Sequence, residues 1–519
     1  MTSTSYDADV LVLGGGPAGA WAAIAAARAG ASVVLADKGY CGTSGAAASG
    51  GNNLWYIPPG PARERVIEAR EQAAFGLTDR EFMARTLAET WDRVEDLTAW
   101  GYPYPRDEQG RPIRSSLQGP EYMRRMRRRV HRGGVTILDH HPALELLVTA
   151  EGEVAGAAGV ARQRDGARWR CRAGAVVLAT GGCAFLSKAF GLNVDTGDGH
   201  LMAAEVGADL SGMEFSAAYG LSPAFGNHTK GLMMQFASYY DSSGRRLEAG
   251  GMARTDLARR AAAGEQLYAR LDRAPAELRD AARSAQPNYF LPLDKAGLDP
   301  FTERYPIRFV LEGTVRGTGG LRLTGPDCGT GIPGLYAAGD VATREPVSGA
   351  ISGGGSYNAA WAISTGTWAG TAAARFGAGR RPGEFRAAGR AGLRPSGGSG
   401  RTGTDEIVEA VQAEVTPLDR NFFRTSGGLV ASLGVLDDAW KRLSAELSGA
   451  DPRSTLAARQ AAAMTAHARW MYRSALARPE SRGLHRRDDA PATDPGFAHR
   501  IVTGGLDDVW TRAGEPVAA

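Results

Sequence analysis

A chain of 519 residues with 43% hydrophobic residues is long enough for two to four domains with apolar cores of their own. Its net charge of +4 is mild, and only five of its 60 basic residues are lysines, which indicates an arginine bias, so we expect no nucleic-acid partner. Its four cysteines lack the spacing of a zinc or iron–sulfur site, its first residues lack the basic and apolar regions of a signal peptide, and it contains no run of 18 apolar residues. We therefore expect a cytoplasmic protein with no membrane span and no metal centre of its own.

Residues 9–39 have the pattern of a strand, a glycine turn, a helix and a second strand that ends in an acid. The turn is a G-x-G-x-x-G in which Gly14 permits the tight bend, Gly16 lets the backbone approach a pyrophosphate, and Gly19 lets the helix meet the strand. A lone glycine motif is weak evidence. Here each flanking element lies at the spacing that a dinucleotide-binding unit requires.

Pro17 and Ala18 complete this motif at the start of the helix, where unpaired N–H groups can bind phosphate oxygens. The second predicted strand, over 32–36, ends at Asp37, which is placed to accept hydrogen bonds from an adenosine ribose. The next residue, Lys38, is also a predicted cofactor contact.

The next segment, residues 41–53, consists mostly of small side chains that cannot form a core element. Such a run is typical of backbone that passes close to a flat ligand. The cofactor contacts predicted within it are Ser44, Gly45, Gly50 and Gly51.

Residues 133–182 alternate as in a strand meander, whose last strand, over 175–179, is expected to return to the main sheet. Thr180 and Gly181, which follow that strand, and Ala143 are predicted cofactor contacts. A loop over 193–199, which contains the predicted contact Asp198, then opens a helix over 200–206, and Met213-Glu214-Phe215 follows.

The order GGGPAG, a small-residue S/T-x-G-G segment, VVLATGG, TGDGHLMAAEVGA and GMEF resembles the flavoprotein subunits of fumarate reductase and succinate dehydrogenase. L-aspartate oxidase and the alpha subunit of adenylylsulfate reductase share this pattern. The resemblance resumes at IPGLYAAGD, which ends in Asp340, and at ESRGLHRRD near the C-terminus. It covers residues 216–315 least well, and the part of that region over 245–290 has a helical pattern.

The resemblance implies an α/β fold in which a Rossmann-type FAD-binding domain is interrupted by a capping domain and followed by a mainly helical C-terminal domain. The expected boundaries are 1–215 and 316–375 for the two parts of the FAD-binding domain, 216–315 for the capping domain and 376–519 for the helical domain. The implied cofactor is FAD, and no second glycine motif is present for a nicotinamide cofactor. Asp340 would hold the ribityl chain.

The segment 348–358 leads into an apolar helix and would direct N–H groups at the pyrimidine edge of the flavin. Its predicted cofactor contacts are Ser356, Tyr357 and Asn358. Ser44 stands at the position of the histidine that carries covalent FAD in the family. The FAD is therefore expected to be bound non-covalently.

Three further departures concern the groups that clamp dicarboxylates in the family. Two histidines are replaced by Tyr219 and Val315, and an arginine by Ser352. This argues against plain succinate or fumarate as the substrate.

Four residues are the candidates for catalysis. Arg254 lies in a segment that resembles the family's proton-shuttle arginine run, although with one extra residue, and Arg316 offers an anion contact; for both, the alternative is a surface salt bridge. Tyr219 stands where the family has a histidine. His228 lies in the region expected to face the flavin, and its alternative is a solvated loop histidine.

The leading hypothesis is an FAD-dependent oxidoreductase that transfers hydride between flavin N5 and a small organic substrate with an anionic or carbonyl anchor. Electrons would pass to oxygen, a quinone or a partner protein. One alternative is an adenylylsulfate-reductase-like flavoprotein with a separate iron–sulfur partner, and another is a flavin-bound electron-transfer subunit with no substrate of its own.

Overall fold

The computed structural model describes residues 3–163, 166–229, 232–248, 254–352, 354–397 and 402–516. Its largest sheet is built around the N-terminal strand β1, which pairs in parallel with β2 and β8. β5 and β16 extend the parallel part, whereas β7, β6 and β17 add antiparallel strands at the other edge. The strands of this sheet are β1 (Ser3–Leu13), β2 (Val33–Ala36), β5 (Thr136–Leu138), β6 (Ala143–Val148), β7 (Val154–Val160), β8 (Arg168–Leu178), β16 (Leu335–Ala337) and β17 (Arg386–Ala387). The predicted return of a meander strand to the main sheet is thus confirmed in β8.

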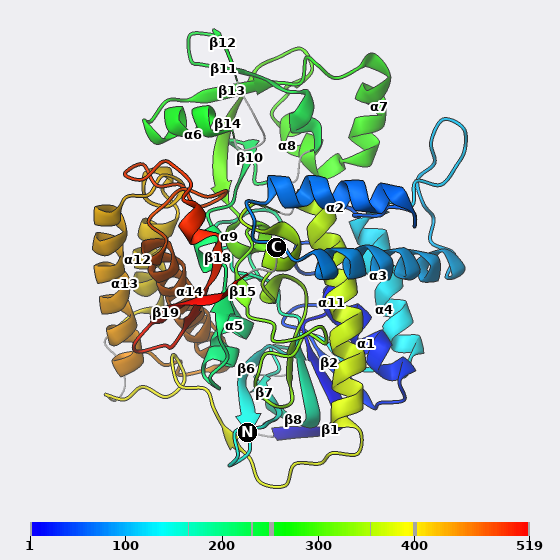
Figure 1. The fold of residues 1–519 in the computed structure, drawn as a ribbon, viewed down its shortest axis with the longest axis vertical. Coiled ribbons are helices and arrows are strands. Elements are labelled where there is room, and N and C mark those ends of the chain that lie inside the picture. The colour runs from blue at the N-terminus through cyan, green and yellow to red at the C-terminus, as the bar shows by residue number, and fades with distance from the viewer. Residues whose placement is uncertain are drawn as a thin grey trace.

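One face of this sheet is covered by two helices that pack closely, α1 (Pro17–Arg28) and α11 (Gly354–Gly377). Their approach depends on glycine, because a Cβ atom on Gly370 would lie 2.2 Å from the carbonyl oxygen of Ala22. Further helices flank this layer (Figure 1): α2 (Pro61–Ala73), α3 (Arg80–Ala99) and α4 (Gly119–Arg132). A small antiparallel pair of strands, β3 (Gly51–Asn53) and β4 (Ser116–Gln118), joins the small-residue segment to the start of α4. The helix packing therefore fixes the glycine turn and the start of α11 relative to each other.

A second, antiparallel sheet is built from strands within residues 219–311 and stands at the top of Figure 1. Its strand order is β10-β14-β13-β11-β12, and three helices and a 3-10 turn accompany it. The elements are β10 (Tyr219–Pro223), η2 (Leu232–Phe236), β11 (Ser238–Tyr240), β12 (Arg246–Leu247), α6 (Thr255–Ala262), β13 (Leu267–Arg270), α7 (Ala276–Ala285), α8 (Pro287–Lys295) and β14 (Tyr305–Leu311). The helical pattern predicted for 245–290 was incomplete, because β12 and β13 are short strands held by pairing with distant residues.

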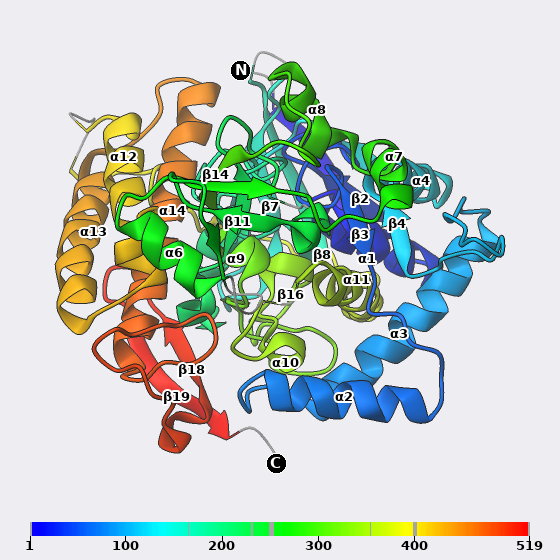
Figure 2. The same ribbon diagram turned by 90° about the horizontal axis from the view of Figure 1, so that it is seen from above.

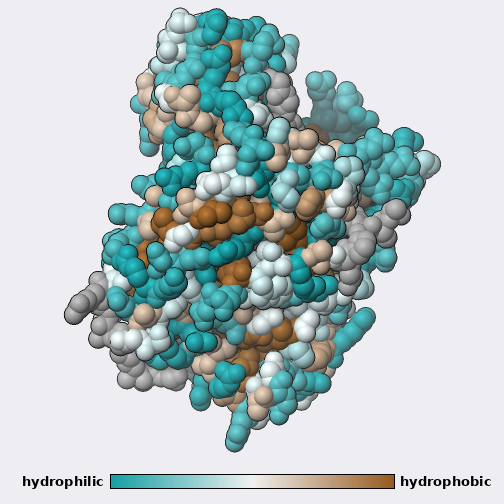
Figure 3. Space-filling model, turned by 60° about the vertical axis from the view of Figure 1, so that its left-hand side comes forward, coloured by the Kyte–Doolittle hydropathy of each residue, from teal (hydrophilic) through white to brown (hydrophobic). Residues whose placement is uncertain are grey.

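Three long helices, α12 (Thr404–Val415), α13 (Ser426–Glu446) and α14 (Pro452–Ala477), form the C-terminal layer on the left of Figures 1 and 2. A π-helical turn η4 (Leu418–Phe422) connects α12 to α13 and contacts α6 of the second sheet. A four-stranded sheet completes this side: β9 (Leu210–Ser211), β15 (Gly320–Leu321), β18 (His499–Gly504) and β19 (Trp510–Pro516). Viewed from this side, the surface is mostly hydrophilic, with separate apolar patches (Figure 3).

Short elements connect these layers. They are α5 (Asp198–Ala204), η1 (Met213–Phe215), α9 (Gly313–Arg316), η3 (Gly339–Val341), α10 (Glu345–Ser348) and η5 (Pro495–Phe497). Several of them line or border the cavity described next.

Candidate FAD and substrate site

A cavity with about 1340 Å³ of empty space, part of it open solvent, lies at the carboxyl ends of four parallel strands of the main sheet. Leu13, Ala36, Ala179 and Ala338, at or just beyond the ends of β1, β2, β8 and β16, all line it. Open α/β sheets bind their ligands at this edge, so the cavity has the place expected for a dinucleotide.

The glycine turn forms one wall of the cavity. Gly14 has a φ of +108°, and a Cβ there would lie 2.2 Å from the carbonyl oxygen of Ala179. A Cβ on Gly19 would lie 1.8 Å from the carbonyl oxygen of Gly14, so α1 starts directly against the turn. A Cβ on Gly16, by contrast, would have no atom within 4 Å. Gly16 thus presents bare backbone to open space at the start of α1, as a pyrophosphate requires.

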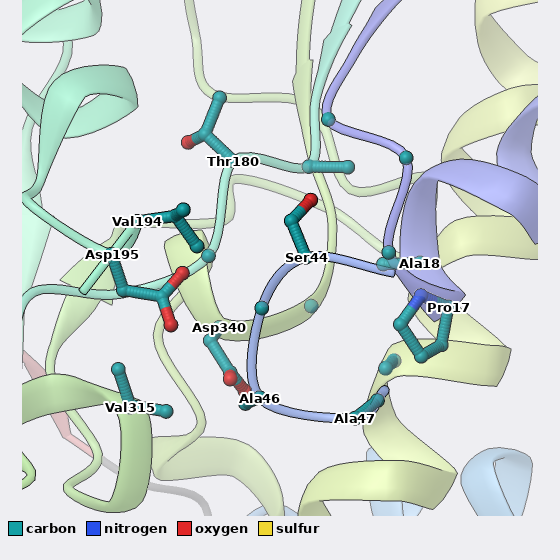
Figure 4. Close-up of a pocket in the computed structure, with 18 of the residues that line it drawn as sticks. Pro17, Ala18, Ser44, Ala46, Ala47, Thr180, Val194, Asp195, Val315 and Asp340 are labelled. Atoms are coloured by element: carbon teal, nitrogen blue, oxygen red, sulfur yellow. The ribbon is translucent and has the colours of Figure 1, made fainter. Parts of the chain in front are cut away.

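Asp37 is buried next to this turn. One carboxylate oxygen accepts a hydrogen bond from the Gly15 N–H at 2.5 Å, and the other accepts from the Gly39 N–H at 2.7 Å and from the Ser44 hydroxyl at 3.0 Å. The loop that carries Ser44 is therefore held against Asp37. Figure 4 shows Ser44, Ala46 and Ala47 of this loop lining the cavity together with Pro17 of α1.

Lys38 and Asp198 form an ion pair at 2.6 Å across the cavity wall. The Lys38 ammonium also donates to the Thr196 hydroxyl at 2.8 Å and to the Val194 carbonyl at 3.0 Å. Both predicted contacts therefore line the cavity, but the charge of each is largely neutralised by the other.

Two buried polar atoms on the cavity wall have no hydrogen-bond partner among the described residues: the Thr180 hydroxyl and the side-chain oxygen of Asn358. The Asn358 amide nitrogen donates to the Val315 carbonyl at 3.2 Å, which directs the oxygen elsewhere. Because a buried polar group without a partner is costly, these two atoms indicate a ligand with donors and acceptors of its own.

Most of the predicted cofactor contacts come together on this one cavity. Those that line it are Gly14, Gly16, Pro17, Ala18, Asp37, Lys38, Ser44, Gly45, Gly51, Ala143, Thr180, Gly181, Asp198, Asp340 and Asn358. Sequence reasoning missed Asn52, Ala46, Ala47, Val194, Asp195, Met202 and Gly339, which also line it. Asn52 and Asp195 lie within segments already singled out, but nothing in the local pattern distinguished them from their neighbours.

Four predicted contacts do not line the cavity. Gly19 serves the packing of α1, and the Gly50 carbonyl accepts from the Gly119 N–H at 2.9 Å. The Ser356 carbonyl accepts from the Trp55 N–H, and the Tyr357 ring packs against Trp55 with 4.8 Å between ring centres. The α-helix that begins at Gly354 turns these two side chains away, whereas Asn358 faces the cavity.

Among the predicted catalytic residues, Arg316 lines the cavity, next to Val315. Its side chain is 20% exposed, and its Nε lies 3.6 Å from a carboxylate oxygen of Glu312. This separation exceeds hydrogen-bonding distance, and the same Glu312 oxygen accepts from the Thr229 hydroxyl at 2.7 Å. Arg316 thus forms a long, partly buried ion pair with Glu312 rather than an exposed one.

The other three candidates point elsewhere. The Tyr219 hydroxyl donates to the carbonyls of Val415 and Thr416 at 3.0 and 3.1 Å, and burial raises its pKa. His228 is not a solvated loop histidine, since it is only 5% exposed and its ring lies against Phe190. Neither side chain lines the cavity.

Arg254 caps the N-terminus of α6, with its guanidinium 5.6 Å from the ring centre of Tyr239. It does not line the cavity. The residue before it, Ala253, falls outside the described residues.

Within the described ranges, no three His, Cys, Asp or Glu residues gather in a way that could hold a metal ion. No helix in those ranges has the length and apolar character needed to cross a membrane. The four cysteines are buried, and burial raises the pKa of the Cys41 and Cys171 thiols to about 12.

The sequence matches two family models, the FAD binding domain over residues 9–261 and the fumarate reductase flavoprotein C-terminal domain over residues 419–507. L-aspartate oxidase of Mycobacterium tuberculosis is 30% identical over 538 aligned residues, which cover 96% of each chain. A fumarate reductase (CoM/CoB) protein of Methanothermobacter marburgensis is 28% identical over 41% of this chain and 42% of its own.

Solved structures share the fold. The FrdA chain of E. coli quinol fumarate reductase superposes with a TM-score of 0.82 at 20% identity, covering 99% of this chain and 98% of its own. Adenylylsulfate reductase from Archaeoglobus fulgidus gives a TM-score of 0.79 at 18% identity, covering 100% and 97%.

Proposed function

The chain belongs to the family of FAD-dependent oxidoreductases that includes L-aspartate oxidase and the fumarate reductase flavoproteins, and on this basis we propose that it oxidises or reduces a small organic substrate with an anionic or carbonyl anchor. The anchor is Arg316, and the substrate is neither plain succinate nor plain fumarate. The observation that carries the proposal is that Arg316 lines the same cavity as the glycine turn.

The cavity fits FAD in the features that the chain itself supplies. Gly16 offers bare backbone at the start of α1, Asp37 lies where a ribose would bind, and Thr180 and Asn358 present polar atoms without partners. When bound, FAD supplies the two-electron chemistry of the reaction. With Ser44 at the attachment position and its hydroxyl donating to Asp37, the cofactor is held without a covalent bond.

Arg316 binds the anionic or carbonyl group and orients the substrate. Glu312 lies close enough to steady the guanidinium but at 3.6 Å does not occupy its donors, so they remain available in the cavity. A fixed guanidinium in a partly dry site attracts an anion more strongly than one in water, because the local dielectric is lower.

A second carboxylate has no matching clamp. Val315 lines the cavity with an apolar side chain, and the Tyr219 hydroxyl is engaged by the backbone of α12 and the residue after it. The Ser352 hydroxyl accepts from the Gly354 N–H at 3.2 Å. An unpaired carboxylate buried here would cost too much to bind, which disfavours small dicarboxylates.

The proposal is tested by mixing oxidised holoenzyme anaerobically with a panel of acids and following the visible flavin absorbance. The panel contains monocarboxylic hydroxy and amino acids with apolar side chains, their amides, succinate and L-aspartate. We expect at least one monocarboxylate to bleach the flavin faster than its amide. If no acid in the panel bleaches the flavin, the protein has no substrate of this class, and the alternative of an electron-transfer subunit is favoured.

L-aspartate oxidation is the second candidate, favoured by the relative that matches 96% of the chain. The replaced clamp at Tyr219, Val315 and Ser352 argues against it. If L-aspartate alone bleaches the flavin, this second candidate is correct and the exclusion of dicarboxylates is wrong.

A further inference from the structure

A buried histidine of the C-terminal layer contacts the short helix α9, which carries Val315 and Arg316 on the cavity wall. His467, on α14, has no exposed surface, and its Nε2 lies 3.1 Å from the hydroxyl oxygen of Thr314. Thr314 comes directly before the two cavity residues in the sequence. A side chain of the helical layer therefore reaches the element that carries the proposed anchor of the substrate.

The start of α9 is attached to the main sheet through Cys183, shortly after β8. The Thr314 N–H donates to the Cys183 carbonyl at 3.1 Å, and the Cys183 N–H donates to the Thr314 hydroxyl oxygen at 2.8 Å. Gly313 has a φ of +54°, and a Cβ atom there would lie 2.0 Å from the same Cys183 carbonyl oxygen. The first two residues of α9 thus lie directly against the backbone that follows β8.

The Thr314 hydroxyl links this attachment to His467. Its oxygen accepts from the Cys183 N–H, so its proton is available for a bond with the imidazole. Burial, together with the neighbouring His200, lowers the pKa of His467 well below its usual range, so the ring is neutral. The other ring nitrogen, Nδ1, has no hydrogen-bond partner among the described residues. The contact with Thr314 is therefore the polar interaction of this ring.

Close packing holds the His467 ring in this direction. The rings of Phe185 and His200 meet it edge to face, with 5.7 and 4.8 Å between ring centres. A Cβ atom on Gly197 would lie 3.3 Å from Nδ1, so backbone approaches the ring there as well. Because a close-packed interior restricts rotation of the ring, Nε2 stays directed at Thr314.

Filling the core does not by itself account for a histidine at this position. An apolar ring of similar size would occupy the space without leaving a buried nitrogen unpaired, which costs roughly 1–3 kcal/mol. The histidine makes the hydrogen bond to Thr314 instead. Arg344 holds the same helix by donating to the Thr314 carbonyl at 2.6 Å. One residue thus fixes α9 through its backbone and another fixes it through a side chain.

The direction of Arg316 depends on the position of α9. Its Nε lies 3.6 Å from a Glu312 oxygen, which is longer than a hydrogen bond, so this neighbour steadies the guanidinium without fixing it. The backbone of α9 therefore determines where the guanidinium enters the cavity. A misplacement of about 1 Å at a group that positions a substrate can cost about 100-fold in rate.

We propose that His467 is a positioning residue that, through the Thr314 hydroxyl, fixes α9 and so directs Arg316 at the anionic or carbonyl group of the substrate. His467 itself does not touch the substrate. The inference rests on the proposed function for the role of Arg316 as the anchor. It gives the C-terminal layer a part in substrate binding, although none of the described residues of that layer lines the cavity.

The test is calorimetric titration of oxidised holoenzyme at equal FAD content, with hexanoate as a monocarboxylate that has an apolar chain and hexanamide as the neutral probe. We expect the wild type to bind hexanoate more tightly than hexanamide. His467→Phe should weaken hexanoate binding by roughly tenfold and leave hexanamide binding unchanged. His467→Gln, whose amide can take the place of Nε2, should recover part of the loss. Thr314→Val removes the hydroxyl from the other side and provides the same comparison if His467→Phe does not fold.

A double-mutant cycle separates positioning from a general loss of structure. Adding His467→Phe to Arg316→Met should not weaken hexanoate binding further, because the residue that His467 positions is already absent. A further tenfold loss in the double variant would overturn the inference.

The matched control is Tyr472→Phe, which removes another buried hydrogen bond of α14, from the Tyr472 hydroxyl to the Glu414 carbonyl at 2.6 Å. It should leave hexanoate binding unchanged, and weakening equal to that of His467→Phe would overturn the inference. A preference for hexanoate that is lost in Arg316→Met but kept in folded His467→Phe and Thr314→Val would overturn the inference and leave the proposed function standing. No preference in the wild type would overturn the anchor role of Arg316, and the positioning role of His467 with it.

Discussion

Arg344, whose side chain has no exposed surface, lies 2.6 Å from a carboxylate oxygen of Asp340 on the cavity wall. The same guanidinium donates to the carbonyls of Thr314 and Gly317, the residues around α9. It therefore connects the acid expected to contact the ribityl chain with the element that carries Arg316.

Replacing Arg344 by Met should lower the free energy of unfolding by about 3–5 kcal/mol, because it removes the buried cation that Asp340 and two carbonyls contact. Urea unfolding of the purified protein measures this loss. Arg380→Met is the control, since it removes an exposed ion pair with Glu153 and should cost less than about 1 kcal/mol. Equal midpoints for the two variants would show that the buried pair does not stabilise the fold.

The FAD should leave the polypeptide on acid or heat denaturation, because Ser44 cannot form the link that a histidine forms at this position. Absorbance of the supernatant and of the precipitated protein measures the distribution. Ser44→Ala removes the hydrogen bond to Asp37 and should weaken FAD binding by about 1 kcal/mol without changing its release. Yellow colour that stays with the denatured chain would contradict a non-covalent cofactor.

Glu345 should make the fold less stable as the pH rises from about 4.5 to about 7, against the opposite contribution of the buried His200, His467 and His485, whose pKa values burial lowers. Burial raises the pKa of Glu345 from 4.5 to about 7, opposed by the charge of Arg500 and supported by that of Glu214. In this window the folded protein holds a proton that the unfolded chain has lost, so each pH unit costs up to roughly 1.4 kcal/mol.

Unfolding free energies of wild type and Glu345→Gln, measured between these pH values, isolate this contribution. The difference between the two proteins should change by up to roughly 1.4 kcal/mol per pH unit, whereas Glu406→Gln, at a side chain 56% exposed, should keep the wild-type pH slope. Equal slopes in wild type and Glu345→Gln would contradict a raised pKa of Glu345.

NADH and NADPH should not reduce the flavin within the turnover time, because the single glycine motif serves one dinucleotide. Stopped-flow mixing under anaerobic conditions measures the rate of bleaching. Rapid bleaching by either nucleotide would require a second binding site and would contradict this expectation.

The FAD cavity could be predicted from the sequence because its geometry is local. The bend at Gly14, the approach at Gly16 and the acid at Asp37 depend on residues within one βαβ unit, and the structure brings them together. Likewise, the strand end before Thr180 was recognisable from an apolar run and a following glycine.

The side chains that face the substrate could not be predicted in the same way. Tyr219 points where it does because the carbonyls of Val415 and Thr416, distant in sequence, accept its hydroxyl. His228 is buried by Phe190 from another segment. Such directions depend on how the second sheet packs on the C-terminal helices, which no local pattern contains.

The central claim is that Arg316 anchors the substrate in the FAD cavity. The most direct test compares the affinities of wild type and Arg316→Met, at equal FAD content, for the acid that bleaches the flavin. Loss of one charge-assisted contact costs about 2–4 kcal/mol, so the account predicts binding weaker by roughly 30-fold or more, with partial recovery in Arg316→Lys. Unchanged affinity in Arg316→Met, or fast succinate oxidation or fumarate reduction by the wild type, would contradict it.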